Sequence, residues 1–215
     1  MNQLQSAILK TLAYADVFDS PLTLKELHLF LIGQKAELKD LKKAISELKQ
    51  VEKSGLYLFI KGQRQLVYQR QKRAKVSLMK LKIARKVAWV LKTIPTVKMV
   101  ALTGALAMNN TQKKDDIDFL VVTSKNRLWL TRPWIVFLIE LLARRRHPGD
   151  KEFEDKICLN MFLAEDCLKI PPQEQSLYTA HEICQLKPLW QKDNLYQKLL
   201  KANSWSQKFL PNWKP

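Results

Sequence analysis

Two aspartates stand one residue apart at the start of a run rich in β-branched residues, with Asp116 and Asp118 opening the stretch DIDFLVVT. Alternate residues of an extended strand face the same side, so both carboxylates would project together, about 6.5 to 7 Å apart along the backbone. Two carboxylates on one face repel each other unless a cation lies between them. Hard oxygen ligands of this kind suit Mg²⁺ or Mn²⁺ carrying nucleotide phosphates. The pair is therefore a candidate metal site.

A lone glycine ends the apolar run before the aspartates, in VKMVALTG from Val97 to Gly104, and the residues ALAM after it can start a short helix. Glycine lets the backbone approach a ligand closely, and the free amides at a helix start can face a triphosphate. We therefore expect Gly104 and the backbone amide of Ala105 to contact a nucleoside triphosphate. The alternative is an ordinary loop that enters a buried strand and exposes two acids.

The glycine turn Gly104-Ala105, a spacer and Asp116-Ile117-Asp118 on the next strand together resemble the motif of the nucleotidyltransferase superfamily related to DNA polymerase β. The resemblance implies that the two aspartates hold metal ions, which position the triphosphate so that its nucleoside monophosphate passes to an acceptor. It also implies a third acid on a later strand, which helps to deprotonate the acceptor hydroxyl. The family's serine is replaced by Ala105, so its hydroxyl contact to phosphate is missing.

The later strand, KICLNMFL over 156–163, carries Asn160 where the resemblance implies an acid. An amide binds a metal weakly and cannot act as a general base. Glu152, Glu154 and Asp155 precede this strand and would substitute for the acid if its start bends inward. Two functions therefore stay open: an active nucleotidyltransferase, and a degenerate nucleotidyltransferase fold that acts as a nucleic-acid-binding or regulatory protein. A protein-interaction module is a third alternative.

The elements before this site read as three helices and a hairpin. Leu4, Ile8 and Leu12 recur at helical spacing, a capping box of Thr23 with Glu26 starts a second helix, and a third begins at about residue 37. The stretch GLYLFIKGQRQLVYQR over 55–70 predicts a β-hairpin with its turn near Gly62. This order resembles winged helix-turn-helix domains over roughly residues 1–72, in which the third helix enters the major groove.

The charge also points to nucleic acid. The chain has 37 Lys and Arg against 20 Asp and Glu, a net charge of +17, and no acid from Lys53 through Lys114. A run of cations is usually a solvated face, but one without acids repels itself, and a phosphate backbone would relieve that repulsion. The residues that we expect to contact nucleic acid are Lys42, Lys43, Lys61, Arg64, Arg70, Lys72 and Arg73.

Residues 126–146 predict one long helix with a broad apolar face, which we expect to be buried, with an interfacial position as the alternative. The apolar segment 133–143 is too short to span a bilayer, so no stable membrane insertion is expected. Arg132 needs an anion in this apolar setting, either a triphosphate or, as we favour, a carboxylate. Arg146 and its two neighbouring arginines suit the helix C-terminus electrostatically and could also bind phosphate.

The cysteines and the N-terminus indicate a reducing compartment. Cys158, Cys167 and Cys184 show no zinc-site spacing, and their odd number argues against a disulfide framework. The first residues lack the features of a signal peptide, so we expect a cytoplasmic location.

The sequence thus predicts an α+β fold in three parts. These are a winged helix over residues 1–72, a small nucleotidyltransferase-like domain with a mixed sheet over 73–165, and a helical C-terminal extension over 166–215. The extension carries Trp190, Trp205 and Trp213, which we expect to pack on the sheet, with base stacking as the lesser alternative.

Overall fold

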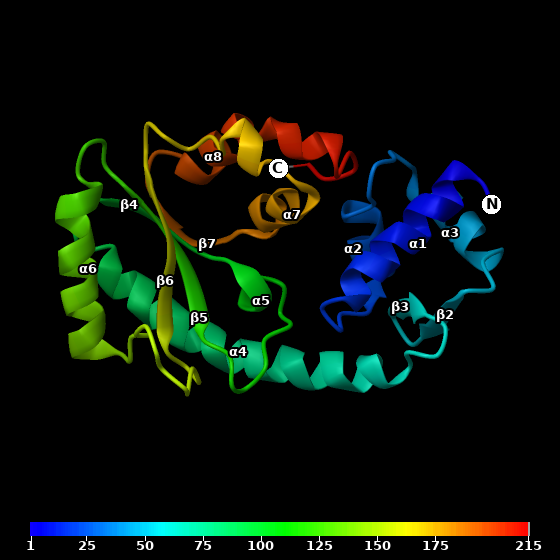
Figure 1. The fold of residues 1–215 in the computed structure, drawn as a ribbon, viewed down its shortest axis with the longest axis horizontal. Helices are drawn as coiled ribbons and strands as arrows, with labels where there is room; N and C mark the ends of the chain where they lie inside the picture. The colour runs from blue at the N-terminus through cyan, green and yellow to red at the C-terminus, as the bar shows by residue number, and fades with distance from the viewer. Residues whose placement is uncertain (215) are drawn as a thin grey trace. The chain divides into compact units, whose positions relative to one another are not determined.

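The computed structural model describes residues 1–214 and divides them into two compact units. One unit contains Met1–Lys72, Pro172–Cys184 and the residues from Ser204 onward, and the other contains Arg73–Pro171 and Gln185–Asn203. Each unit combines helices with one small sheet (Figure 1). The predicted α+β class is therefore confirmed.

The first unit begins with three helices and a three-stranded antiparallel sheet. The helices are α1 (Gln3–Asp16), α2 (Leu24–Leu29) and α3 (Leu38–Ser46), and the strand order is β1 (Leu22–Thr23), β3 (Tyr57–Ile60), β2 (Val51–Ser54). The predicted capping box starts α2, because the Glu26 amide donates to Thr23 Oγ1 at 3.2 Å and the Glu26 carboxylate accepts from the Thr23 amide at 2.8 Å. The three helices were thus predicted correctly.

The predicted hairpin turn at Gly62 is wrong. The strands β2 and β3 join through Gly55, whose φ of +57° suits a glycine, and the residues from Gln65 onward form the long helix α4 (Gln65–Leu91). Leu58 and Phe59 are both buried and line one small cavity together with Leu66 of α4. The side chains of β3 therefore do not alternate between buried and exposed, because the start of α4 covers the face that would otherwise meet solvent.

The second unit is built on a mixed sheet, as predicted, and this sheet has four strands. Its order is β6 (Ile157–Ala164), β5 (Ile117–Thr123), β4 (Val97–Leu102), β7 (Lys187–Gln191). The pair β5 and β6 is parallel, whereas β4 runs antiparallel to β5 and to β7. The short helix α5 (Gly104–Ala107) follows β4, in agreement with the expected turn and helix start.

The predicted helical C-terminal extension is interrupted by a strand. Between α7 (Leu177–Gln185) and α8 (Leu195–Ala202), the strand β7 pairs with β4 at the edge of the sheet. Trp190 lies in this strand opposite Val100, so it is a sheet residue rather than part of a helix. Trp205 and Trp213 are buried, but both belong to the first unit, whereas they were expected to pack on the sheet of the nucleotidyltransferase-like domain.

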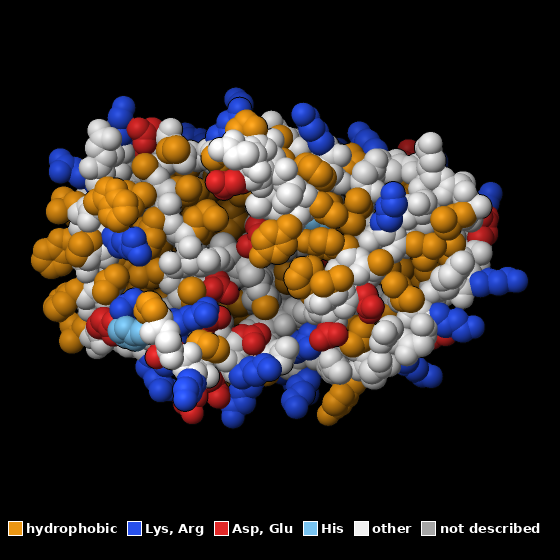
Figure 2. All heavy atoms as spheres, in the orientation of Figure 1, with side chains coloured by type: hydrophobic (Ala, Val, Ile, Leu, Met, Phe, Trp, Pro, Cys, Tyr) orange, Lys and Arg blue, Asp and Glu red, His pale blue; other side chains and the backbone are white. Residues whose placement is uncertain are grey.

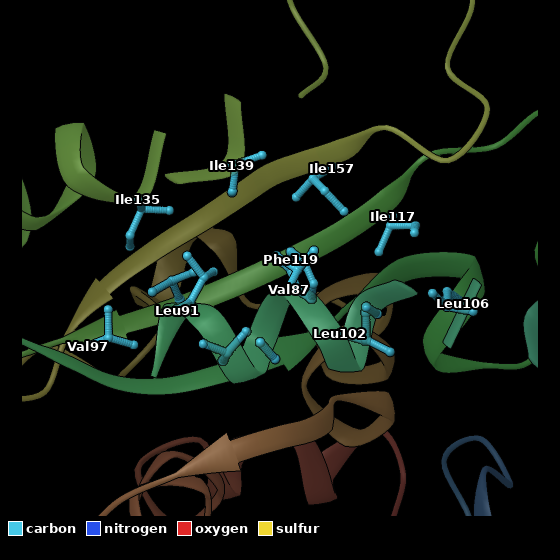
Figure 3. Packing of buried hydrophobic residues seen from close by; sticks show 14 of the residues in the cluster. Val87, Leu91, Val97, Leu102, Leu106, Ile117, Phe119, Ile135, Ile139 and Ile157 are labelled. Carbon is cyan, nitrogen blue, oxygen red and sulfur yellow. The ribbon is translucent and has the colours of Figure 1, made fainter. Parts of the chain in front are cut away.

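One buried hydrophobic cluster of the second unit lies on one face of its sheet (Figure 3). Residues of α4 and of α6 (Leu128–Leu142) share a buried cluster with three alternate residues of β5, namely Ile117, Phe119 and Val121. Because successive side chains of a strand point to opposite faces, the residues between them must point away from this cluster. The packing of β5 therefore directs Asp118 to the other face of the sheet.

The expectation that α6 is buried is wrong. Its buried residues are Thr131, Ile135 and Ile139, whereas Trp129 and Trp134 are exposed. The helix is apolar on nearly all sides, but the sheet can cover only one of them. Within residues 1–214, no helix is both long and apolar enough to cross a membrane.

Candidate metal centre

Three possible metal ligands meet where β5 begins. One carboxylate oxygen of Asp116, one of Asp118 and Sγ of Cys158 all lie within 4.8 Å of one another. Ile117 between the two aspartates is fully buried in the core, so the pleat of the strand sends both carboxylates to the opposite face. The two acids that sequence analysis singled out are thus brought together, with a thiol beside them.

The thiol comes from the neighbouring parallel strand, where Cys158 is the Cα partner of Asp118. From the sequence, Asn160 was expected at the place on this strand where the resemblance implies a third acid. A register shift after Phe119 makes Leu120 pair with Met161, which leaves Asn160 outside the ladder. Cys158 was therefore not predicted, although it lies two residues before Asn160 and would share a strand face with it if no bulge intervened.

The side chain of Asn160 is directed to a different neighbour. Its Nδ2 donates a hydrogen bond of 3.3 Å to Oγ1 of Thr103, the buried residue just before the glycine turn. Asn160 is therefore not among the three clustered ligand atoms. Asn160 nevertheless contacts Thr103, the residue just before the glycine turn that lies against Asp118.

A guanidinium group neutralises part of the cluster. Nη1 of Arg146 donates to Oδ2 of Asp116 at 2.6 Å and lies 4.0 Å from Sγ of Cys158. The guanidinium also stacks 4.5 Å from the ring centre of Phe153. The expected role of Arg146 at a helix end is wrong, because α6 ends at Leu142 and the following segment runs beside β6.

Burial and neighbouring negative charge oppose the ionisation of Asp118 and Cys158, and Arg146 offsets this effect only in part. Burial, and after it the negative charge of Asp116, raise the pKa of Asp118 to about 6. Burial, followed by the charge of Asp118, raises the pKa of the Cys158 thiol to about 12. The thiol is thus protonated at neutral pH in the free protein, and a bound cation would favour the ionised form of each group.

The glycine turn lies directly against this cluster. Gly104 has a φ of +61°, and a Cβ built on it would lie 3.0 Å from Oδ2 of Asp118. The adjacent backbone is tied to the same residue, since the Thr103 amide donates to the Asp118 carbonyl at 3.1 Å. Ala105, the next residue, is exposed. The turn therefore brings backbone that no side chain covers within contact distance of the Asp118 carboxylate.

A buried lysine holds the loops that lead into β5 and β6. Nζ of Lys80 donates to the carbonyl oxygens of Lys113 at 3.0 Å and Asp115 at 2.8 Å, and to the carboxylate of Asp155 at 2.7 Å. The Asp115 carboxylate in turn accepts from the Gln112 amide at 2.7 Å. These contacts fix the backbone on both sides of the cluster.

The acids before β6 do not substitute for a third carboxylate. Asp155 is bound to Lys80, Glu154 lies 3.7 Å from Lys113, and Glu152 is exposed. The start of the strand does not bend so as to bring them to the aspartates. The substitution considered from sequence is therefore wrong.

Arg132 has aromatic neighbours rather than the expected carboxylate. The side chain is exposed, and its guanidinium carbon lies 5.8 Å from the ring centre of Trp129 and 5.5 Å from that of Phe162. Stacking of this kind satisfies an arginine that has solvent on its other side. The preference for a carboxylate partner was therefore wrong.

Most of the residues expected to contact nucleic acid are exposed on the first unit. They belong to α3, to the turn after β3 and to the first part of α4. The exposed members of the set are Lys42, Lys43, Lys61, Arg64 and Lys72.

Two members of that set have structural roles instead. Arg70 is buried, with Nη2 bound to Glu26 at 2.9 Å and Nη1 bound to Oγ of Ser20 at 2.7 Å. Arg73 is half-buried and donates to Oδ1 of Asn110 at 3.4 Å. The assignment of Arg70 to a nucleic-acid surface is wrong, because a buried arginine bound to a carboxylate cannot meet a phosphate.

Comparison with known proteins leaves the family open. No protein-family model matches the chain, and no curated protein matches it. One similar solved structure is a toxin-antitoxin with AMP-PNP, at 13% identity and a TM-score of 0.31 over 57% of this chain and 89% of that chain. Another is a mutant of the toxin-antitoxin MntA-HpeT, at 14% identity and a TM-score of 0.33 over 60% and 89% of the two chains. At these scores neither similarity defines the fold or the function of this chain.

Proposed function

We propose that this protein uses Asp116 and Asp118 to hold a divalent cation with a nucleoside triphosphate, and transfers the nucleoside monophosphate to a hydroxyl or similar group of an acceptor, releasing pyrophosphate. The observation that carries the proposal is the cluster of Asp116, Asp118 and Cys158, whose ligand atoms lie within 4.8 Å of one another beside Gly104. A pair of carboxylates on one strand, next to an open glycine turn, suits the binding of a metal–phosphate group.

The donor set fits a divalent cation. The two carboxylates offer hard oxygen ligands, and the partial burial of Asp118 next to a like charge creates a need for positive charge. Cys158 adds a softer donor, which Mn²⁺ accepts more readily than Mg²⁺ does. When bound, the cation would neutralise phosphate charge in the transfer.

The residues around the cation have distinct proposed tasks. Arg146 binds one oxygen of Asp116 and so orients that carboxylate, leaving its other oxygen for the metal. Gly104 has no side chain on the side of Asp118, and the backbone amide of Ala105 is proposed to donate to the triphosphate. Arg132 is exposed and lies over the rings of Trp129 and Phe162, so it stays a candidate for phosphate binding.

A second candidate function is nucleotide or nucleic-acid binding without catalysis. Two observations favour it: the third ligand position holds Cys158 with a pKa of about 12, and Asn160 cannot accept a proton. The ion pair between Arg146 and Asp116 also supplies the positive charge that a metal would otherwise supply. An active enzyme would need the proton of the acceptor hydroxyl to leave to water or to a phosphate oxygen of the triphosphate.

We further propose that the first unit is a winged helix that contacts nucleic acid. The chain order α1, β1, α2, α3, β2, β3 with a three-stranded sheet supports this assignment. Lys42 and Lys43 on α3, with Lys61 and Arg64 after β3, are the proposed backbone contacts. Arg70 is left out because it is buried.

The experiment that tests the proposal is incorporation of labelled nucleotide from each of the four triphosphates, with Mg²⁺ or Mn²⁺, into RNA, DNA and protein. Asp118→Asn is the test variant, and Asp166→Asn, an exposed acid of the same unit, is the matched control. Incorporation that Asp118→Asn abolishes and Asp166→Asn retains would support the enzyme. Binding of nucleotide or nucleic acid without incorporation would favour the second candidate, and absence of incorporation and of both kinds of binding would contradict the two.

A further inference from the structure

The outward face of α6 is apolar although nothing in its own unit covers it. Six large side chains of this helix are exposed, among them Trp129 at 76% and Trp134 at 58% of their full surface. Figure 2 shows hydrophobic side chains gathered over α6, at the left of the view. We call this set the α6 face; it consists of Trp129, Leu130, Trp134, Phe137, Leu141 and Leu142. A contiguous apolar surface of this kind usually marks a binding site.

The helix α4 borders this face with positive charge. Lys86 and Val90 of α4 line one shallow groove with Leu138 and Leu142 of α6, so the two helices lie side by side. On the exposed side of α4, Trp89 lies among the cations Lys82, Arg85 and Lys86. Of these cations, Lys86 lines the groove that α4 shares with α6.

The border lacks compensating acids. The sequence of α4 contains no Asp or Glu, and α6 contains a single one, Glu140. Arg145 already binds that carboxylate at 2.7 Å, and His147 lies 3.1 Å from it. The surface that faces outward is thus apolar in the middle and cationic along α4.

We propose that the α6 face and the cations of α4 bind the surface of an anionic lipid bilayer. Tryptophan and leucine side chains enter the boundary between headgroups and acyl chains, and lysines next to them attract anionic headgroups. The binding is peripheral, since α6 would lie in the plane of the interface rather than cross it. The proposal is independent of the metal centre and of any nucleotidyl transfer.

Other occupants fit the surface less well. Nucleic acid would match the cations and could stack on the tryptophans, but it offers nothing for the exposed aliphatic chains of Leu130, Leu141 and Leu142. A second copy in a symmetric contact would bring the same cations of α4 close to each other, without acids between them. A bilayer with anionic headgroups complements both the apolar middle and the positive border.

The test is flotation of the 215-residue chain with vesicles of phosphatidylcholine alone and of phosphatidylcholine with phosphatidylglycerol. We expect binding to the anionic vesicles to be at least about tenfold tighter, since each nearby lysine contributes about fivefold. The variants are Trp134→Gln with Phe137→Gln for the apolar part, and Lys82→Gln with Lys86→Gln for the charge. Each pair should weaken binding to anionic vesicles by about tenfold or more.

The controls separate the surface from general effects. All four substituted side chains are exposed, so the variants should retain the circular dichroism and the melting temperature of the original protein. Leu56→Gln changes an equally exposed apolar residue of the hairpin turn in the first unit, and should leave vesicle binding unchanged.

Four outcomes would overturn the proposal. The first is absence of binding to either kind of vesicle, and the second is vesicle binding that the Trp134 and Phe137 substitutions leave intact. The third is a dimer, seen in light scattering, that these substitutions abolish while the protein binds no vesicles. The fourth is an acidic protein partner that binds the α6 face while vesicles do not.

Discussion

The backbone of Gly104 and the carboxylate of Asp118 are in direct contact range, because a Cβ on the glycine would lie 3.0 Å from Oδ2 of the aspartate. This proximity joins the two parts of the proposed site, a turn that can approach phosphate and a carboxylate that can bind a metal. It also makes position 104 intolerant of a side chain for two separate reasons, the steric contact and the φ of +61°.

Gly104→Ala should therefore harm the metal centre more than its backbone strain alone explains. We expect a loss of stability of about 1–2 kcal/mol from the positive φ, together with weaker Mn²⁺ binding as the Asp118 carboxylate is displaced. Gly55→Ala is the matched control, since Gly55 has a φ of +57° and nothing within 4 Å of its added Cβ. Isothermal titration with Mn²⁺ and thermal melts of both variants separate the effects; equal Mn²⁺ affinity in the two variants would contradict the contact.

Cys158→Asp should change the metal preference of the site. A third carboxylate next to Asp118 favours Mg²⁺ and offers a proton acceptor, so nucleotide incorporation with Mg²⁺ should rise by on the order of 100-fold. The substitution of an exposed thiol, Cys167→Asp, should have no such effect. An unchanged ratio of Mg²⁺-dependent to Mn²⁺-dependent incorporation would show that position 158 does not contact the metal.

The metal-free protein should become less stable as pH rises through the titration of Asp118. Its folded-state pKa of about 6 lies above the ordinary value of 3.8, so folding favours the protonated form. The stabilising contribution of this protonated carboxyl is complete below about pH 4 and is lost by pH 6 to 7, a change of about 3 kcal/mol. Relative to the original protein, Asp118→Asn should thus gain stability over this window. Urea unfolding in the presence of a chelator at several pH values measures the difference in the free energy of unfolding between the two proteins. A difference that does not change with pH would contradict the prediction.

Arg146→Gln should strengthen metal binding. The guanidinium orients Asp116, which it reaches at 2.6 Å, but its positive charge also repels any ion at the cluster, and we expect the repulsion to outweigh the orienting effect. We expect Mn²⁺ to bind about tenfold more tightly once this charge is removed. Arg144→Gln alters an exposed arginine nearby and serves as the control. Weaker Mn²⁺ binding by Arg146→Gln alone would instead show that orienting Asp116 matters more than the competing charge.

Substitutions of Arg70 and Lys43 should affect different properties: the first should lower stability, and the second should weaken nucleic-acid binding. Arg70→Met breaks a buried ion pair with Glu26 and should lower the free energy of unfolding by about 3 kcal/mol. Lys43→Gln changes an exposed cation of α3, and should leave stability within about 0.5 kcal/mol while weakening nucleic-acid binding. Chemical denaturation and salt-dependent binding to DNA and RNA check the two effects, and equal DNA affinity with and without Lys43 would exclude α3 from the interface.

The features that sequence alone could predict are those set by near neighbours in the chain. The alternation in DIDFLVVT placed Asp116 and Asp118 on one side because side-chain direction in a strand depends only on local backbone geometry. The capping box of Thr23 and Glu26 was equally local, since its two hydrogen bonds span three residues.

Tertiary structure decided which residues lie beside these elements in space. Cys158 rather than Asn160 joins the aspartates because the register of two parallel strands, with its shift after Phe119, is set by long-range pairing that no local pattern encodes. Arg146 reaches Asp116 across thirty residues only because its segment runs beside β6. The exposure of α6 was undecided by its apolar sequence, since burial depends on what packs against a helix, and the sheet covers only the side that bears Ile135 and Ile139.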